Sequence, residues 1–584
     1  MAKSSGSDMS SPPTLSFCAA ETAALEQWTA ELPLVNTQET TRLLALAATE
    51  LSEIELSPQQ RLELLDVIRP SLRYICTRID RASLGKGTRD SGTASQTLQR
   101  HMCNAYRRAF DQTLVALEKD KPPSKDLLSR IGHRLISELS LTMLRSFQYY
   151  IQVPETFWSQ LHSAYAELER RELEDYKLKD GEAVVRDLTI RESYLRILLL
   201  QTGKPNQLNH TELTNLYTAL EEWSKHASLV DPVSDAIFTV DLTGNQPAQF
   251  SQLQPKTGAL RGLRTEVITY ELEAYLNSVS STVVVPENVS NELILHAIAS
   301  WGTMQPRAYN RIASETPIRL SIGLRATHYF LSGGIDFTEQ ISNADALLRR
   351  EVNPFLEVDY EPMAAPADDD PWSQAHDLKI KMPENPNVEE PNRILLESAK
   401  QDTAQRKYDH YELVAADTSP GGYRVRWPEK MPREARVGEL VSLREESDPR
   451  WCVAVVRWIS RSGEHAEMGV EFLSPKAIPV AIRNIRKMGG GTEFQRALLL
   501  PGLDSIDQPA TMITPKLPFA EQQKISVQRQ GLQTTGMLMD LVVNTQSFNQ
   551  FTFRVLDGYL ESSVSPSKMS DLSAMNREDT TRGP

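Results

Sequence analysis

Two groups of residues, far apart in the chain, have side chains that suit the binding of a nucleotide. Arg307 and Arg311 are separated by three residues, and Asp417, Ser419 and Gly422 lie together in a turn. A guanidinium group can pair with the edge of guanine, neutralise a phosphate or stack on a base. A carboxylate can accept from guanine N–H groups, a hydroxyl can donate or accept, and glycine allows close approach of the backbone. We expect one nucleotide site where the fold brings both groups together.

The turn belongs to a stretch in which apolar and polar residues alternate. Residues 408–472 contain the segments YDHYELVAADTSPGGYRVRW, VGELVSLRE, WCVAVVRWIS and MGVEFLSP. A period of two, interrupted by turns that contain glycine or proline, is typical of short antiparallel strands. The chain around the turn is therefore predicted to form a β-sheet or barrel.

This stretch resembles the PilZ domain family. Residues 417–422 (DTSPGG) fit the D-x-S-x-x-G turn of that family, and residues 453–458 (VAVVRW) and 469–472 (GVEF) look like its closing strands. The resemblance implies a six-stranded antiparallel β-barrel. It also implies a bacterial receptor for cyclic di-GMP, because many members bind this messenger.

The family has a second motif, R-x-x-x-R, on a loop before the first barrel strand. Directly before Tyr408 only Arg406 and Lys407 are present, whereas residues 307–311 (RAYNR) precede the strand-like segment TPIRLSIGL. The match requires residues 335–405 to be an insertion after the first strand, and the entropy of loop closure grows only slowly with length. The resemblance then assigns cyclic di-GMP to Arg307, Arg311, Asp417, Ser419 and Gly422. The alternatives are an ordinary turn at 417–422 and surface ion pairs between the two arginines and the acidic insertion.

The R-x-x-x-R spacing alone is a weak signal. It recurs at Arg69/Arg73, Arg130/Arg134 and Arg457/Arg461. The first two pairs lie in predicted helices, where this spacing places both side chains on one face, which we expect to be solvated. Only the pair at 307 and 311 lies in a loop that leads into a strand.

Length and composition limit the classes of protein. With 584 residues the chain is expected to form several domains, and its 40% hydrophobic and 24% charged residues are ordinary for a globular protein. The net charge of −14 argues against a partner such as duplex nucleic acid.

The four scattered cysteines and the scattered histidines form no metal or catalytic motif, so we expect no metal, no cofactor and no enzyme activity. The start has no signal pattern and no apolar run is long enough to span a membrane, which favours a cytoplasmic protein.

Most of the first half of the chain has the three-and-four spacing of amphipathic helices. The predicted helices cover residues 37–54, 58–80, 97–119, 125–151 and 155–173, and Ser57 and Ser124 stand where N-caps belong. We therefore predict an all-α bundle or array of stacked helix pairs over residues 15–230.

The predicted fold class is a multidomain α + β protein. It has disordered ends (1–14 and 561–584), the helical domain, and a mixed connecting subdomain (231–300). These are followed by the arginine loop and first strand (301–334, with strand character over 316–331) and the acidic, proline-rich insertion (335–405). The PilZ-like barrel (406–484) and a second antiparallel β-domain (485–560) complete the chain.

Two functions are consistent with these patterns. The first is a cytoplasmic cyclic-di-GMP receptor or adaptor in which ligand binding changes an interaction with an unidentified protein partner. The second is a degenerate PilZ barrel within a protein-interaction scaffold that acts without nucleotide. The displaced R-x-x-x-R motif is the main support for the second function.

Overall fold

The computed structural model describes residues 14–86, 89–117, 124–178, 188–231, 236–251, 258–302, 310–342, 408–428, 431–462, 465–485, 492–502, 508–529 and 532–557. Arg307, residues 343–405 of the predicted insertion, residues 406–407 of the predicted barrel and nearly all of both predicted disordered ends lie outside the described residues. The chain divides into two compact units, Met1–Pro306 with Arg461–Gly463, and Arg307–Ser460 with Glu464–Pro584.

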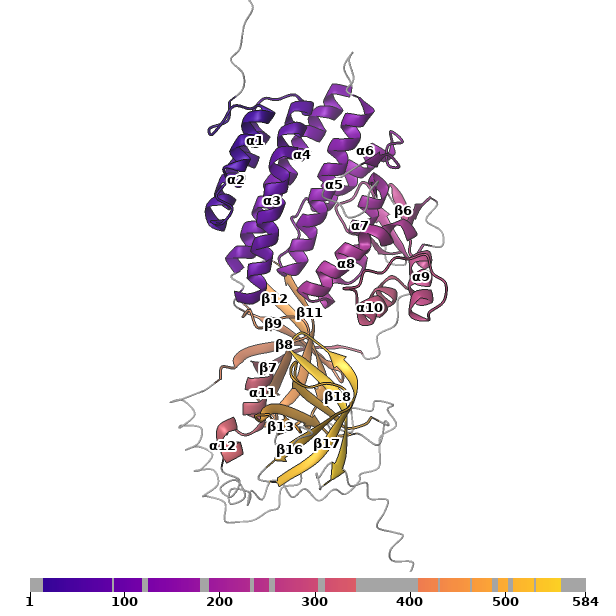
Figure 1. Ribbon diagram of the computed structural model, residues 1–584. Helices are drawn as coiled ribbons and strands as arrows, with labels where there is room; N and C mark the ends of the chain where they lie inside the picture. Colours follow the sequence, from indigo (N-terminus) through magenta and orange to yellow (C-terminus); the bar gives the residue numbers. More distant parts are fainter. Residues whose placement is uncertain are drawn as a thin grey trace, which may run out of the picture. The chain divides into compact units, whose positions relative to one another are not determined.

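Helices dominate the first unit, as predicted, and the long helices α3, α4 and α5 lie side by side (Figure 1). Two predicted N-caps are present: Ser124 Oγ accepts from the Leu127 N–H at 3.1 Å, and Ser57 and Gln60 cap each other's backbone N–H. The helices are α1 (Thr22–Ala30), α2 (Thr37–Glu53), α3 (Pro58–Lys86), α4 (Arg89–Leu117), α5 (Lys125–Gln148), α6 (Phe157–Glu169), α7 (Ile190–Thr202), α8 (His210–Trp223), α9 (Glu266–Leu276) and α10 (Asn291–Trp301), with short 3₁₀ turns η1 (Pro205–Gln207) and η2 (Ser224–His226).

The predicted connecting subdomain is part of this helical unit. A four-stranded sheet, in the order β3-β6-β4-β5, and helices α9 and α10 share one hydrophobic core with the earlier helices. Trp223 of α8 meets Trp301 of α10 edge to face, with ring centroids 6.3 Å apart. Residues 231–300 therefore do not form a separate core. The strands of this unit are β1 (Lys177–Leu178), β2 (Leu188–Thr189), β3 (Ser228–Val230), β4 (Phe238–Asp241), β5 (Gln249–Phe250) and β6 (Leu260–Arg264).

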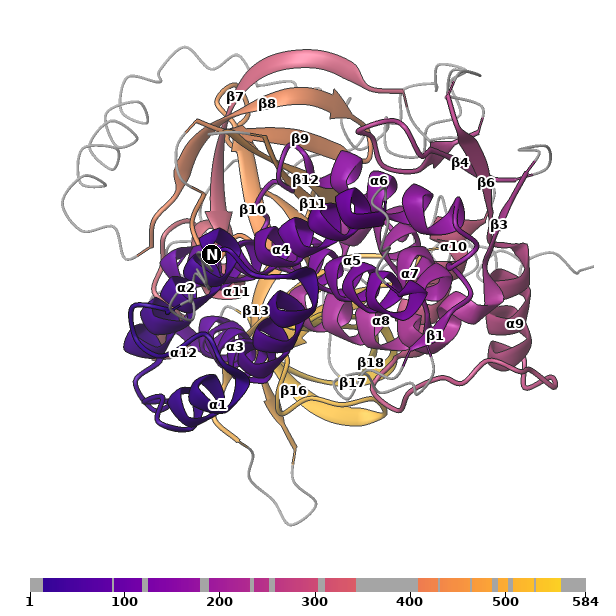
Figure 2. The ribbon, with the colours of Figure 1, turned by 90° about the horizontal axis from the view of Figure 1, so that it is seen from above.

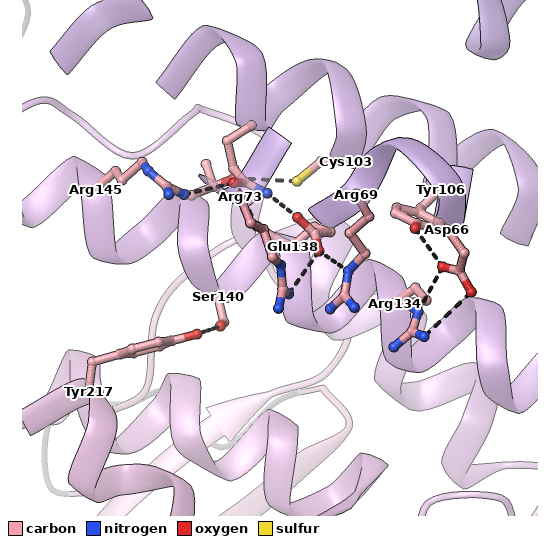
Figure 3. A network of polar contacts seen from close by, with 12 residues as sticks. Asp66, Arg69, Arg73, Cys103, Tyr106, Arg134, Glu138, Ser140, Arg145 and Tyr217 are labelled. Atoms are coloured by element: carbon pink, nitrogen blue, oxygen red, sulfur yellow. Dashed lines mark hydrogen bonds and ion pairs between the residues drawn. The ribbon is translucent and has the colours of Figure 1, made fainter. Parts of the chain in front are cut away.

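Arg69 and Arg73 are not on a solvated face, contrary to our prediction, whereas Arg130 of the second pair is 38% exposed. Figure 3 shows Arg69 and Arg73 of α3 converging on Glu138 of α5, with N···O distances of 2.7 and 2.9 Å. The Glu138 side chain is fully buried. Arg134 pairs with Asp66 at 2.9 Å and Arg130 lies 3.9 Å from the same carboxylate. The spacing places two side chains on one face of a helix, but the partner helix determines whether that face is buried.

Burial by itself would raise the pKa of the Glu138 carboxyl. Attraction to Arg73 and Arg69, with hydrogen bonds from Arg69 and Gln99, outweighs burial and lowers this pKa to about 2. Glu138 is therefore a buried anion that depends on its arginines.

The first barrel of the second unit is closed and six-stranded, in the order β10-β11-β12-β9-β8-β7. Strands β7 and β8 are neighbours, with Ile318 opposite Leu413, although the long segment between them separates them in sequence. This register places that segment between two adjacent strands of one barrel, which is what an insertion requires. The strands are β7 (Ile312–Ile322), β8 (Tyr411–Ser419), β9 (Gly422–Trp427), β10 (Leu440–Glu445), β11 (Cys452–Ser462) and β12 (His465–Ser474).

Helices α11 (Leu324–Leu331) and α12 (Phe337–Ser342) correct two predictions. The strand ends at Ile322 rather than continuing to residue 331, because Gly323 adopts a φ of +89° and turns the chain into α11. Residues 337–342, which we assigned to the insertion, form α12, and Phe337 packs against His328 of α11.

A second closed barrel, in the order β13-β14-β15-β18-β17-β16, confirms the predicted C-terminal β-domain. We had placed residues 478–484 in the first barrel, but they form β13, which pairs with β14 and β16. The first barrel is already complete at β12, and Val480 and Ile482 point into the second core. The strands are β13 (Ile478–Asn484), β14 (Gln495–Leu500), β15 (Thr511–Pro515), β16 (Gln523–Arg529), β17 (Leu532–Asn544) and β18 (Phe548–Asp557).

The two barrels of this unit share a hydrophobic cluster. Leu440 and Val453 of the first barrel pack with Leu498 and Phe548 of the second, and Leu324 of α11 adds to the cluster. At its edge, Ser547 Oγ donates to Glu439 at 2.6 Å. Figure 2, seen from above, labels β7 to β12 of the first barrel and β13, β16, β17 and β18 of the second.

Neither a membrane-spanning helix nor a metal-binding cluster occurs within the described residues. Among them, no helix combines the length and apolar character needed to span a membrane. The same residues contain no cluster of three or more His, Cys, Asp or Glu side chains suited to a metal ion.

Candidate functional site

The predicted ligand turn is a tight hairpin between β8 and β9. Ser419 pairs with Gly422 across a two-residue turn formed by Pro420 and Gly421. The Ser419 hydroxyl donates to the Gly422 carbonyl oxygen at 3.0 Å. The hydroxyl therefore stabilises the turn, as the structural alternative proposed, and its oxygen retains acceptor capacity.

Gly422 is required by the neighbouring strand. Its φ is +152°, and a Cβ atom there would lie 2.9 Å from the Val470 carbonyl carbon and closer still to the carbonyl oxygen. The Phe472 N–H donates to the Gly421 carbonyl oxygen at 3.0 Å, which holds the turn against β12. We assigned Gly422 to close approach of a base, which stays a prediction; the close approach that the structure describes is that of β12.

The substitution Gly422→Ala tests the close packing of the turn against β12. Gly422→Ala should destabilise the barrel by about 1–3 kcal/mol, since both the backbone conformation and the contact with Val470 oppose a methyl group. Gly333→Ala is the matched control, because Gly333 also has a positive φ, +68°, but a methyl group there would meet nothing within 4 Å. Thermal unfolding of the full chain should show a larger decrease in Tm for Gly422→Ala. Equal decreases would show that the contact with β12 is unimportant.

Asp417 is the centre of the charged groups at this turn. The residue is buried, and its Oδ2 lies 2.7 Å from Arg424 Nε. Its Oδ1 lies 3.6 Å from Nη1 of Arg311. This contact arises because Ala313, near the start of β7, pairs with Asp417 on β8. The fold therefore brings Arg311 to Asp417 across the insertion, while Arg307 lies outside the described residues.

Arg424 is a residue that our sequence analysis missed. It pairs with Asp417 in the β8–β9 ladder, and its Nη1 also lies 3.4 Å from a Glu467 oxygen on β12. Alternation along β9 was the available signal, because Tyr423 and Val425 are buried and Arg424 between them must point outward. The outer face of the barrel thus presents Arg311, Asp417 and Arg424 together.

These groups suit an anionic ligand with a hydrogen-bonding base. Arginine can bind a phosphate or guanine O6 and N7, and a carboxylate can accept from guanine N1–H and N2–H. The side chain of Arg311 is 38% exposed and its ion pair is long, so the guanidinium can exchange Asp417 for a ligand at small cost.

Three family models match successive segments of the chain. Residues 23–233 match the model described as "Cyclic-di-GMP receptor FimW, N-terminal domain", and residues 237–479 match "Cyclic-di-GMP receptor FimW, middle PilZ domain". Residues 480–556 match "FimW C-terminal beta-barrel domain". The last boundary agrees with the assignment of most of β13 to the second barrel.

The chain is also similar to a curated protein along nearly its whole length. It is 29% identical over 567 residues to the protein named "Cyclic-di-GMP receptor FimW" from Pseudomonas aeruginosa. The alignment covers 92% of this chain and 91% of that protein. No solved structure matches the chain.

Proposed function

Because this chain belongs to the PilZ family of cyclic-di-GMP receptors, we propose that it binds cyclic di-GMP on the outer face of its first barrel. The contact between Arg311 and Asp417 is the observation that supports this location most directly. This contact joins the R-x-x-x-R segment to the D-x-S-x-x-G turn. The two motifs must lie together if both are to bind one ligand.

The proposed roles follow from the chemistry of each side chain. Arg307 and Arg311 bind guanine edges and phosphates, and Asp417 accepts hydrogen bonds from guanine. Ser419 offers its hydroxyl oxygen as an acceptor, and Gly422 keeps the turn flat against β12. The proposed function requires cyclic di-GMP as its ligand and needs neither a metal ion nor a cofactor.

The proposal includes a response to the ligand. Cyclic di-GMP draws the segment with Arg307 onto the barrel, where Arg311 already lies beside Asp417, and this changes the surface presented to a protein partner. Such coupling requires the ligand to prefer one arrangement of the chain over the other. The proposed location is the cytoplasm, which is what a receptor for a bacterial second messenger implies.

Isothermal titration of the full chain with cyclic di-GMP tests the proposal. We expect saturable binding, and cyclic di-AMP should bind at least about tenfold more weakly, because adenine lacks the O6 and N1–H groups that the site would pair with. A folded sample that takes up no cyclic di-GMP at high micromolar concentration would refute receptor function. Capture of a protein partner that is equally strong with and without the ligand would favour the nucleotide-independent scaffold instead.

A further inference from the structure

Trp458 of β11 lies directly on the backbone of β12. A Cβ atom at Gly469 would lie 2.6 Å from Cδ1 of the Trp458 indole and closer still to Cε2 and Nε1. The five-membered ring of the indole therefore occupies the space above Gly469. Any larger residue at position 469 would displace it.

The indole lies on the outer face of the barrel. Met468 and Val470, on either side of Gly469 in β12, are buried, and successive side chains of a strand point to opposite faces. Gly469 therefore faces outward, and Trp458 covers it from that side. The Trp458 side chain is partly exposed rather than buried.

The same face carries the charged groups of the proposed site. Gly469 pairs with Arg424 on β9, and Arg424 pairs with Asp417 on β8. Paired residues of antiparallel strands project from the same face, and neighbouring strands are about 4.8 Å apart. The indole, the Arg424 guanidinium and the Asp417 carboxylate thus form a row across adjacent strands, and Arg311 lies at its end.

We propose that the Trp458 indole, seated on Gly469, is the surface on which one guanine base of cyclic di-GMP stacks. This inference rests on the proposed function and adds a contact that neither arginine motif supplies. One face of the ring lies against the strand, which leaves the opposite face for a base. Indole offers a large, rigid surface for stacking, and its fixed position lowers the entropy that stacking would otherwise cost.

Substitution of Trp458 tests the contact by isothermal titration. Trp458→Ala should weaken cyclic di-GMP binding by between about 5- and 100-fold, and Trp458→Phe should weaken it less, because a smaller ring still stacks. Ligand should also quench tryptophan fluorescence in the wild type, and Trp458→Phe should remove most of this quenching. Trp451→Phe is the matched control, since Trp451 stacks on Phe330 with centroids 4.7 Å apart and is absent from the row.

Gly469→Ala provides an independent test that removes no chemical group. The added methyl displaces the indole, so affinity should decrease in the wild-type background. In the Trp458→Ala background the same substitution should have little further effect, because no indole remains to be displaced. Wild-type affinity in Trp458→Ala and in Trp458→Phe, together with full quenching in Trp458→Phe, would overturn the proposed stacking surface. If Arg311→Ala still loses affinity in that case, the receptor function stands, whereas a wild type that does not bind removes both proposals.

Discussion

Arg311→Ala should lower the affinity for cyclic di-GMP by about 10- to 100-fold in isothermal titration. A hydrogen bond to a charged group contributes about 1.5–3 kcal/mol, and each 1.4 kcal/mol changes an equilibrium constant tenfold. The fold should be almost unaffected, because Arg311 is partly exposed and its pair with Asp417 is 3.6 Å long. The loss therefore reports ligand contact rather than unfolding.

The chain offers a closely matched control for this variant. Arg319 lies on β7, the strand that Arg311 directly precedes. Its side chain is 36% exposed where that of Arg311 is 38% exposed, and it forms an ion pair of the same length, 3.6 Å, with Glu412. Arg319→Ala removes an equivalent charge and should leave the affinity unchanged. If both variants bind as the wild type does, the site lies elsewhere. If both weaken binding equally, the effect is one of net charge.

Glu138→Ala should have the largest effect on stability, a loss of about 3–5 kcal/mol. The substitution leaves the buried Arg69, whose side chain is 3% exposed, and the partly buried Arg73 without their shared carboxylate. Urea unfolding followed by the helical circular dichroism signal measures the change. Glu39→Ala is the control, because Glu39 and Arg42 form a solvent-exposed pair whose loss should change the stability little.

The pH dependence of unfolding gives a second measurement on the same residue. The pKa of Glu138 is about 2 in the folded chain, against an ordinary value of 4.5. A lowered pKa stabilises the folded state fully above the ordinary value, and this contribution is lost as the pH falls from 4.5 towards 2. Glu138→Gln should remove this part of the pH dependence. A wild type and a variant with parallel profiles over that range would contradict the assignment.

Much of the second unit could be predicted from short-range pattern. Alternation of apolar and polar residues identified the strands around Asp417, and the order of the R-x-x-x-R and D-x-S-x-x-G motifs indicated an insertion between neighbouring strands. The register of β7 against β8 agrees with that order and places Arg311 beside Asp417. The assignment of these residues to cyclic di-GMP stays a prediction that the titrations test.

What could not be predicted depends on partners from other elements. Arg69 and Arg73 satisfy a surface-helix pattern, and only the position of Glu138 on a neighbouring helix accounts for the burial of Arg69 and the partial burial of Arg73. Trp458 similarly has the pattern of an ordinary strand residue. Its indole fills the space above Gly469, and this contact becomes visible only when β11 and β12 are placed side by side. Spacing within one element cannot reveal such contacts.

The cluster shared by the two barrels makes the C-terminal barrel a structural support of the first barrel. Leu440 and Val453 lie in the first barrel, yet their neighbours Leu498 and Phe548 come from the next one. Excision of residues 480–556 would expose this apolar face to water, so we expect the first barrel to be less stable alone than with the second barrel attached. A transplant of the first barrel into another protein should therefore carry both barrels together.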